Sequence, residues 1–171
     1  MNAIAIAKPI AVTNPINNSA LYAINETDAS QAAALFSHAR SVFQDLQLTT
    51  VKERLHELAK VRDSIYLQQE TIVERVVSET GKSRTDALVS EVMGVLDYMD
   101  WLIKHAPKIL ADEKVSTPVA LMGKKSKILH QALGQVLIIS PWNYPFHISM
   151  TTIVAALAAG NTVVFKPSEV T

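Results

Sequence analysis

The clearest pattern of apolar and polar segments lies in residues 134–169. A continuous apolar run at 136–139 is typical of a strand that is buried on both faces of a parallel sheet. Residues 146–159 are apolar over a helical length, and residues 162–165 form a second run of β-branched and aromatic side chains. Because this connection is long enough for a parallel crossover, the pattern predicts a strand–helix–strand (βαβ) unit.

Each predicted strand is followed by a short polar segment. Residues 140–145 read SPWNYP, and the prolines of this segment lack the N–H group that a central strand needs. Residues 166–169 read KPSE, and Gly160 with Asn161 is a stop signal for the helix between the strands. Open α/β sheets bind ligands beyond the carboxyl ends of their strands, so the SPWNYP and KPSE segments form the candidate functional site.

Amphipathic helices are predicted before this unit, because apolar residues recur with helical spacing and charged residues occupy the opposite faces. The first of these helices covers residues 28–48. The later helices are bounded by capping and breaking residues, which are Thr50 with Glu53, Gly81, Ser83 and Pro107. The predicted fold class is therefore α/β, with N-terminal helices followed by the first βαβ unit of a Rossmann-like parallel sheet.

These patterns divide the chain into successive parts. Residues 1–26 are rich in Ala, Ile, Asn and Pro without a clear period, which predicts a flexible N-terminal arm. Residues 27–107 are the helical part, and residues 108–133 are a linker with turn signals and a weakly strand-like end. Residues 134–171 hold the βαβ unit, which is an incomplete sheet because two strands alone are not stable.

Composition narrows the function classes. The chain has 171 residues, which indicates one domain, and its 16 basic and 16 acidic residues give no sign of nucleic-acid binding. It has no cysteine, which excludes disulfides and thiolate metal sites. No apolar run reaches the length of a membrane span, and the first thirty residues show no clear signal or transit peptide, so we expect a cytoplasmic protein.

The sequence gives only weak signals for a metal site or for acid–base residues. His56 and Glu57 begin like a zinc-protease motif, but Lys60 stands where the second histidine is needed, so no metal site is predicted. Glu91 and Asp97 have no partner arrangement in the sequence that would indicate acid–base chemistry.

The segments IISPWNYP at 138–145 and ALAAGNTVVFKPSE at 156–169 together resemble the aldehyde dehydrogenase superfamily, within it the branch that oxidises medium-chain, fatty or aromatic (coniferyl-type) aldehydes. The match covers roughly residue 40 to the end. The resemblance implies oxidation of an aldehyde to a carboxylic acid with NAD or NADP, and a homodimer whose contact uses the β segment of residues 108–133.

The resemblance also implies a cysteine nucleophile and a glutamate general base, both far downstream of KPSE. The chain contains no cysteine and holds two residues after that motif. We therefore expect the N-terminal portion of an enzyme, inactive alone. Uncovered Val, Ile and Leu side chains each forfeit roughly 1.5–3 kcal/mol, so poor stability or aggregation of this piece is also expected.

Asn143 is the candidate catalytic residue. The family uses the asparagine of its PWN motif to stabilise the oxyanion that forms from the aldehyde oxygen, and Asn143 occupies that position. Considered without the resemblance, Asn143 is better explained by a turn between two prolines than by a catalytic role.

The resemblance places the cofactor against both strand ends. Ser140, Pro141 and Trp142 would lie along the nicotinamide nucleotide, and Tyr144 would line the substrate passage, although packing explains both aromatic residues as well.

In the second segment, Lys166 and Glu169 would bind the adenosine ribose, with Ser168 between them. A carboxylate on the ribose 2′-hydroxyl favours NAD, whereas the lysine also suits the phosphate of NADP. The structural alternatives are a solvent-directed lysine, a helix-capping Ser168 and a glutamate in the first turn of a following helix.

Two other functions remain open. The first alternative is a non-catalytic short product that acts as an interaction or pairing module. The second is a nucleotide-binding module that uses only the KPSE end. An in-frame stop after Thr171 would favour the first, and saturable NAD binding by the isolated chain would favour the second.

Overall fold

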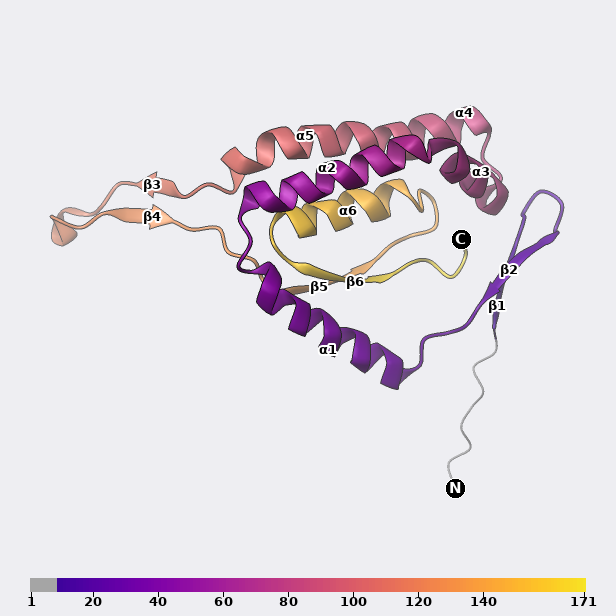
Figure 1. Cartoon of the computed structure of the whole chain (residues 1–171), viewed down its shortest axis with the longest axis horizontal. Helices are drawn as coiled ribbons and strands as arrows, with labels where there is room; N and C mark the ends of the chain where they lie inside the picture. Colours follow the sequence, from indigo (N-terminus) through magenta and orange to yellow (C-terminus); the bar gives the residue numbers. More distant parts are fainter. Residues whose placement is uncertain (1–8) are drawn as a thin grey trace, which may run out of the picture.

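The computed structural model describes residues 9–171 and shows helices packed over a small parallel sheet, with two hairpins projecting from this body (Figure 1). The helices are α1 (Ala29–Leu46), α2 (Val51–Leu67), α3 (Gln69–Thr80), α4 (Arg84–Asp86), the π-helix η1 (Ala87–Met93), α5 (Gly94–Ile109), the 3₁₀-helix η2 (Val119–Leu121) and α6 (His147–Ala158). The strands are β1 (Ile10–Thr13), β2 (Ala20–Ile24), β3 (Glu113–Val115), β4 (Ser126–Ile128), β5 (Gln135–Ile139) and β6 (Thr162–Lys166).

The predicted βαβ unit is confirmed. β5 and β6 are parallel, with Gln135 opposite Thr162 and Ile139 opposite Lys166, and α6 is the crossover between them. Asn161 fixes the corner where α6 turns into β6, because its side chain accepts from the amide of Gly134 at 3.0 Å and donates to the carbonyl of Ala156 at 3.2 Å. The end of the crossover is therefore tied to the start of β5.

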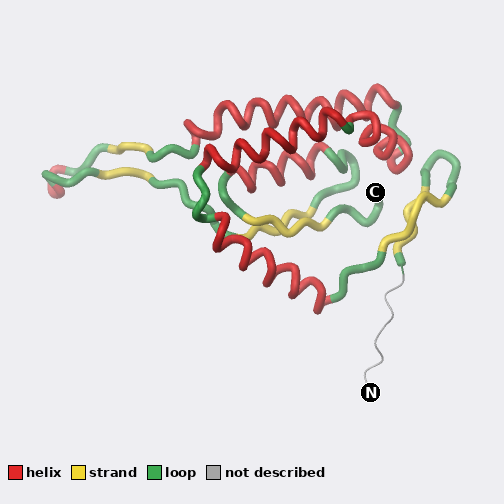
Figure 2. The backbone as a smooth tube through the Cα atoms, in the orientation of Figure 1, coloured by secondary structure: helices red, strands yellow, loops and turns green. Residues whose placement is uncertain are grey.

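The helices and the β5–β6 sheet stack in layers, with their apolar faces toward one another. α6 lies over one face of the β5–β6 pair, and α2 and α5 lie over α6, while α1 contacts the strands from below (Figures 1 and 2). The buried core lies among the helices, and its fully buried members include Val73, Val92, Val95, Met99 and Val154.

The prediction that the first strand is buried on both faces is wrong for this chain. Ile138 is buried, but Leu137 and Ile139 point the other way and are 49% and 66% exposed. Alternate side chains of a strand point to opposite faces. Within residues 9–171 α6 covers one face, and α1 on the other side lies mainly against β6 and leaves these β5 side chains exposed.

The helix starts are set by capping boxes. The Thr50 side chain accepts from the Glu53 amide, and the Glu53 carboxylate accepts from the Thr50 amide, as the sequence predicts. Asp28 and Gln31 make the same reciprocal pair at the start of α1. Hydrogen bonds from the Thr50 amide and hydroxyl lower the pKa of the Glu53 carboxyl group, because they favour its charged form. The pKa of the Asp28 carboxyl group is lowered by the hydrogen bond from the Ser30 hydroxyl and, after it, by the bond from the Gln31 amide.

The helix predicted to start near Ser83 is present, but its interior is not regular. Ser83 caps it by accepting from the Asp86 amide at 3.1 Å, and the chain stays helical to Ile109 through the π-helical stretch η1. π-helical turns are rare and occur frequently at functional sites. Apolar periodicity alone does not distinguish a π-turn from an α-turn, so the sequence did not show it.

The N-terminal arm differs from its prediction. Residues 10–24 form an antiparallel hairpin of β1 and β2, and residues 1–8 of the predicted arm lie outside the described residues. The hairpin is held by residues far along the chain, since the Tyr22 hydroxyl donates to Glu79 at 2.8 Å and Arg75 lies 5.2 Å from the centre of the Tyr22 ring. These contacts are invisible to local composition.

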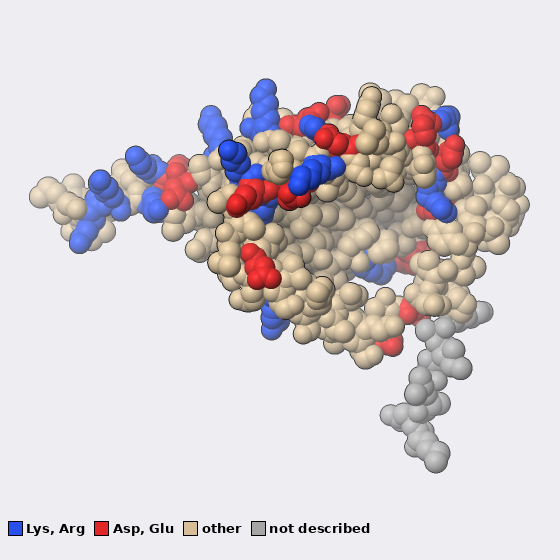
Figure 3. Space-filling model, in the orientation of Figure 1, with Lys and Arg blue, Asp and Glu red and all other residues tan. Residues whose placement is uncertain are grey.

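The linker region contains a second antiparallel hairpin, in which Glu113 pairs with Ile128 and Val115 with Ser126. The predicted β segment is therefore present. This β3–β4 arm extends away from the helices and carries several Lys side chains (Figure 3). Its tip is apolar as well, with Val119 and Met122 each 86% exposed.

Candidate functional site

The structure brings the SPWNYP and KPSE segments together at one edge of the sheet. The Ser140 amide donates to the Lys166 carbonyl at 3.2 Å, which continues the parallel pairing just past both strands. Farther on, the Thr171 hydroxyl donates to the Trp142 carbonyl at 3.4 Å. The predicted convergence of the two segments is therefore observed.

The first segment presents polar and aromatic groups to solvent. Asn143 is exposed, and Trp142 and Tyr144 are 58% and 41% exposed. Ser140 is buried instead, and its hydroxyl has no hydrogen-bond partner among the described residues. A buried hydroxyl without a partner is costly, so this atom has capacity for a ligand or water.

The second segment forms a local ion pair. The Lys166 ammonium donates to Glu169 at 2.6 Å and to the Pro167 carbonyl at 3.1 Å. The hydrogen bond from Lys166 lowers the pKa of the Glu169 carboxyl, so this group is ionised at neutral pH. The Ser168 hydroxyl accepts from the Val170 amide at 3.1 Å, a contact that fits both a turn and the cap of a following helix.

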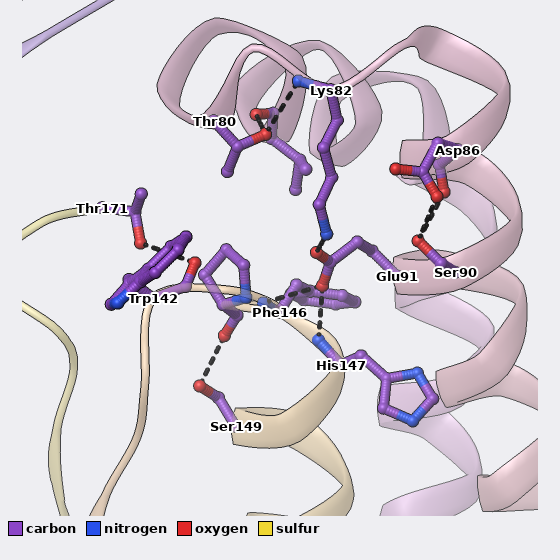
Figure 4. Close-up of polar contacts among 12 residues, drawn as sticks. Thr80, Lys82, Asp86, Ser90, Glu91, Trp142, Phe146, His147, Ser149 and Thr171 are labelled. Atoms are coloured by element: carbon purple, nitrogen blue, oxygen red, sulfur yellow. Dashed lines mark hydrogen bonds and ion pairs between the residues drawn. The ribbon is translucent and has the colours of Figure 1, made fainter. Parts of the chain in front are cut away.

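Glu91 is the residue that sequence reasoning set aside and the structure places in the site. Its side chain has no exposed surface, and one carboxylate oxygen accepts from the amides of Phe146 and His147 at 3.1 and 2.9 Å (Figure 4). These amides lie at the start of α6, immediately after SPWNYP. A helix start leaves amide groups without partners and carries partial positive charge, so a carboxylate stabilises it there.

Lys82 completes this network from the turn between α3 and α4. Its ammonium pairs with the other carboxylate oxygen of Glu91, and it also lies 3.9 Å from the centre of the Tyr144 ring. The Lys82 side chain is 16% exposed. One lysine therefore links the buried carboxylate to the aromatic residue next to Asn143.

The sequence held little sign of this network. Glu91 lies 55 and 56 residues from the amides that it accepts, and no spacing rule links positions so far apart. A charged residue amid the apolar positions of a helix was the available signal.

Other features of the described residues lie elsewhere. A cavity of about 850 Å³ is bordered mainly by α2, with Leu46 of α1 and Leu157 of α6 at its rim, and it contains none of the candidate site residues. In residues 9–171, no group of three His, Asp or Glu side chains is placed to hold a metal ion, and no helix is long and apolar enough to cross a membrane.

The fold and the paired strand-end segments define an α/β protein of the Rossmann-like class. The model of the aldehyde dehydrogenase family matches residues 4–171, and the chain belongs to that family.

Similar curated proteins share this assignment. The chain is 36% identical to the 4,4'-diapolycopene aldehyde oxidase of Methylomonas sp over 156 residues. This aligned region makes up 91% of this chain and 28% of the relative. The chain is 32% identical over 140 residues to the dimeric NADP-preferring aldehyde dehydrogenase of Canis lupus familiaris, covering 82% and 31%. It is also 32% identical over 136 residues to the 4,4'-diaponeurosporen-aldehyde dehydrogenase of Staphylococcus aureus (strain NCTC 8325 / PS 47), covering 80% and 30%.

Solved structures give the same result. An aldehyde dehydrogenase from Brucella melitensis biovar abortus 2308 superposes with a TM-score of 0.89 at 26% identity, over 96% of this chain and 33% of that one. PnpE in complex with nicotinamide adenine dinucleotide superposes with a TM-score of 0.83 at 26% identity, over 92% and 32%. The chain spans about a third of the length of these relatives.

Proposed function

We propose that this chain is the N-terminal part of an NAD(P)-dependent aldehyde dehydrogenase that converts an aldehyde to a carboxylic acid. The observation that carries the proposal is the meeting of SPWNYP and KPSE at the carboxyl ends of β5 and β6 in a chain of this family. The chain contains no cysteine, so the nucleophile and the general base would come from a downstream part of the enzyme.

In this proposal Asn143 acts on the aldehyde oxygen. When a nucleophile adds to the carbonyl carbon, negative charge develops on that oxygen, and an amide N–H that is already aimed at it lowers the barrier. Asn143 lies on an exposed segment whose start is bonded to β6 and whose end is bonded to Glu91 of η1. Anchoring of the backbone on both sides would reduce the reorganisation that the Asn143 amide needs during the reaction.

The cofactor would lie across both strand ends, and it would accept the hydride from the substrate. Lys166 and Glu169 present an ammonium and an ionised carboxylate that suit ribose hydroxyls, and they exchange their mutual contact for the ligand. Ser140, Pro141 and Trp142 would line the nicotinamide nucleotide, with the unpartnered Ser140 hydroxyl as a further donor. Ser168 would lie between Lys166 and Glu169. Its hydroxyl, which accepts from the Val170 amide, still has its O–H to donate to the cofactor.

The substrate class that we propose is an apolar aldehyde. Two of the relatives are named for 4,4'-diapolycopene and 4,4'-diaponeurosporene aldehydes, and the exposed Trp142 and Tyr144 rings offer apolar surface beside Asn143. Tyr144 would line the passage for such a chain.

We also propose that the complete enzyme is a homodimer that uses the β3–β4 arm. The arm extends away from the helices, and the exposed apolar side chains of Val119 and Met122 at its tip would be buried by contact with a partner subunit. One relative is named as dimeric.

The test of the catalytic role is Asn143→Ala in the complete enzyme, with aldehyde-dependent NAD(P)H formation as the readout. Loss of one oxyanion donor typically lowers kcat by ~10²–10³-fold, and the KM for the cofactor should change little. Asn17→Ala in the β1–β2 turn is the matched control and should leave kcat unchanged. An Asn143→Ala enzyme with wild-type kcat would remove Asn143 from the mechanism.

The intact mass of the protein from its native source separates this proposal from its alternative. A species much heavier than 18.7 kDa agrees with an enzyme of which this chain is one part. A species at that mass would favour the non-catalytic interaction or pairing module instead.

A further inference from the structure

The buried network of Glu91 and Lys82 has a charge arrangement that packing alone does not require. A carboxylate with no exposed surface is costly unless it is paired and hydrogen-bonded. Glu91 meets this requirement with the Lys82 ammonium and with the amides of Phe146 and His147. Figure 4 shows the Lys82 side chain reaching the Glu91 carboxylate from above, while Phe146 and His147 meet it from below.

The helix around Glu91 is shaped for this contact. Glu91 lies in the π-helical stretch η1, where the turn holds an additional residue and the side-chain positions shift relative to an α-helix. Gly94 follows one turn later, and a Cβ atom at this position would lie 2.5 Å from Cε1 of His147. The missing side chain therefore lets η1 and α5 approach the start of α6 closely enough for the Glu91 bonds.

The Glu91–Lys82 network holds one end of the segment that carries Asn143. Glu91 fixes the residues that follow SPWNYP, and Lys82 lies against the Tyr144 ring, directly next to Asn143. On the other side, the Ser140 amide is fixed to β6 by its bond to the Lys166 carbonyl. The segment that carries Asn143 is therefore fixed at Ser140 and again at Phe146 and His147, and the second attachment depends on the Glu91 carboxylate alone.

We propose that Glu91 and Lys82 are positioning residues for the Asn143 segment, holding its amide where the aldehyde oxyanion forms. This inference rests on the proposed oxyanion role of Asn143. Neither residue touches the substrate in this proposal, and neither contacts the Lys166–Glu169 pair at the other strand end. Their loss should therefore reduce turnover and leave cofactor binding intact.

The test uses the complete enzyme with Glu91→Leu, Glu91→Gln and Lys82→Met. Glu91→Leu removes the acceptor, and we expect kcat to fall by about 10-fold or more, because a displacement of ~1 Å at a catalytic group costs on the order of 10²-fold. Glu91→Gln keeps one acceptor oxygen and should fall between wild type and Glu91→Leu. Lys82→Met should lower kcat in the same direction, and the KM for NAD(P) should stay within about twofold for all three variants.

Two control variants separate positioning from general stability. Val95→Ala, in the fully buried first turn of α5, destabilises the same region without touching the carboxylate network. Glu70→Ala removes an exposed ion pair with Arg84 near Lys82. Both controls should retain kcat when assayed well below their melting temperatures.

Hydrogen exchange of the peptide that contains Phe146 and His147 is the second readout. Glu91→Leu should accelerate exchange of these amides, because they lose their acceptor, and Val95→Ala should not do so selectively. The proposal is overturned if Glu91→Leu lowers kcat no more than Val95→Ala, or if exchange in this peptide is unchanged.

This design separates the inference from the proposed function. A wild-type complete protein that forms no NAD(P)H with any aldehyde would refute the proposed function. Faster exchange at Phe146 and His147 in Glu91→Leu would then still show the anchoring contact, while the inferred catalytic purpose would fall with the function.

Discussion

Glu91, Gly94 and His147 lie in contact where η1 and α5 meet the start of α6. The Glu91 carboxylate accepts from the His147 amide, and Gly94 leaves the space that the His147 ring fills. Within the described residues the Nδ1 atom of His147 is buried without a hydrogen-bond partner, so packing and not a hydrogen bond holds the ring in place. Small changes here should be felt at the start of α6.

At this scale we predict that Gly94→Ala destabilises the protein. Alanine gains up to about 1 kcal/mol of helix propensity over glycine, but the new Cβ would lie 2.5 Å from His147, and overpacking typically costs about 1–3 kcal/mol. The steric cost should exceed the gain, and the melting temperature followed by circular dichroism should fall. Lys104→Ala on the exposed face of the same helix is the control; an equal or higher melting temperature for Gly94→Ala would contradict the close contact.

At the scale of elements, the helix ends are set by short-range hydrogen bonds. Thr50 and Glu53 satisfy each other's backbone amides at the start of α2, and Arg54 reaches across to the last turn of α6, donating to the Ala158 carbonyl at 3.1 Å. Burial lowers the pKa of Arg54, which nevertheless remains charged at neutral pH. The capping box was predictable because its partners are three residues apart, whereas the Arg54 contact spans 104 positions.

The Glu53 cap should give the stability a pH dependence. Its folded-state pKa lies below the ordinary value of 4.5, so its stabilising contribution is present above that value and is lost as the pH falls through the lowered pKa. The difference in melting temperature between wild type and Glu53→Gln should therefore be largest near neutral pH and should shrink in acid. Glu113→Gln on the β3–β4 arm makes the same charge change away from a helix start, and a difference that grew in acid would contradict the assigned sign.

At the scale of the whole molecule, the sheet is the incomplete part. Leu137 and Ile139 are exposed on the face away from α6, and Phe165 of β6 is 38% exposed. Two strands with both outer edges unpaired also offer backbone groups to other chains. This surface and the apolar tip of the β3–β4 arm are the two places where the isolated chain should associate.

We predict that the isolated chain binds a hydrophobic dye and associates in a concentration-dependent way through the sheet. Ile139→Lys should reduce light scattering, because it places a charge on the uncovered face, where Ile139 is 66% exposed. Ile128→Lys on β4, where Ile128 is 47% exposed, is the matched comparison for the arm. A larger effect of Ile128→Lys would assign the association to the arm, and a monomeric wild type at high concentration would contradict the prediction.

The sequence alone determined the helices between residues 28 and 107, the βαβ unit, and the two segments at its strand ends. These features depend on local patterns: apolar periodicity, proline and glycine positions, and capping pairs a few residues apart. The β1–β2 hairpin escaped detection because its anchors, Glu79 and Arg75, lie on α3.

Only the tertiary structure decided what surrounds Asn143. The burial of Glu91, its bonds to the amides at the start of α6, and the approach of Lys82 to Tyr144 all join positions that are far apart in the chain. The sequence pattern around a glutamate on a helix is the same whether its carboxylate contacts water or the start of another helix. Its role is set by the neighbours that folding brings to it, because desolvation and hydrogen bonding depend on the whole surroundings and not on the local pattern.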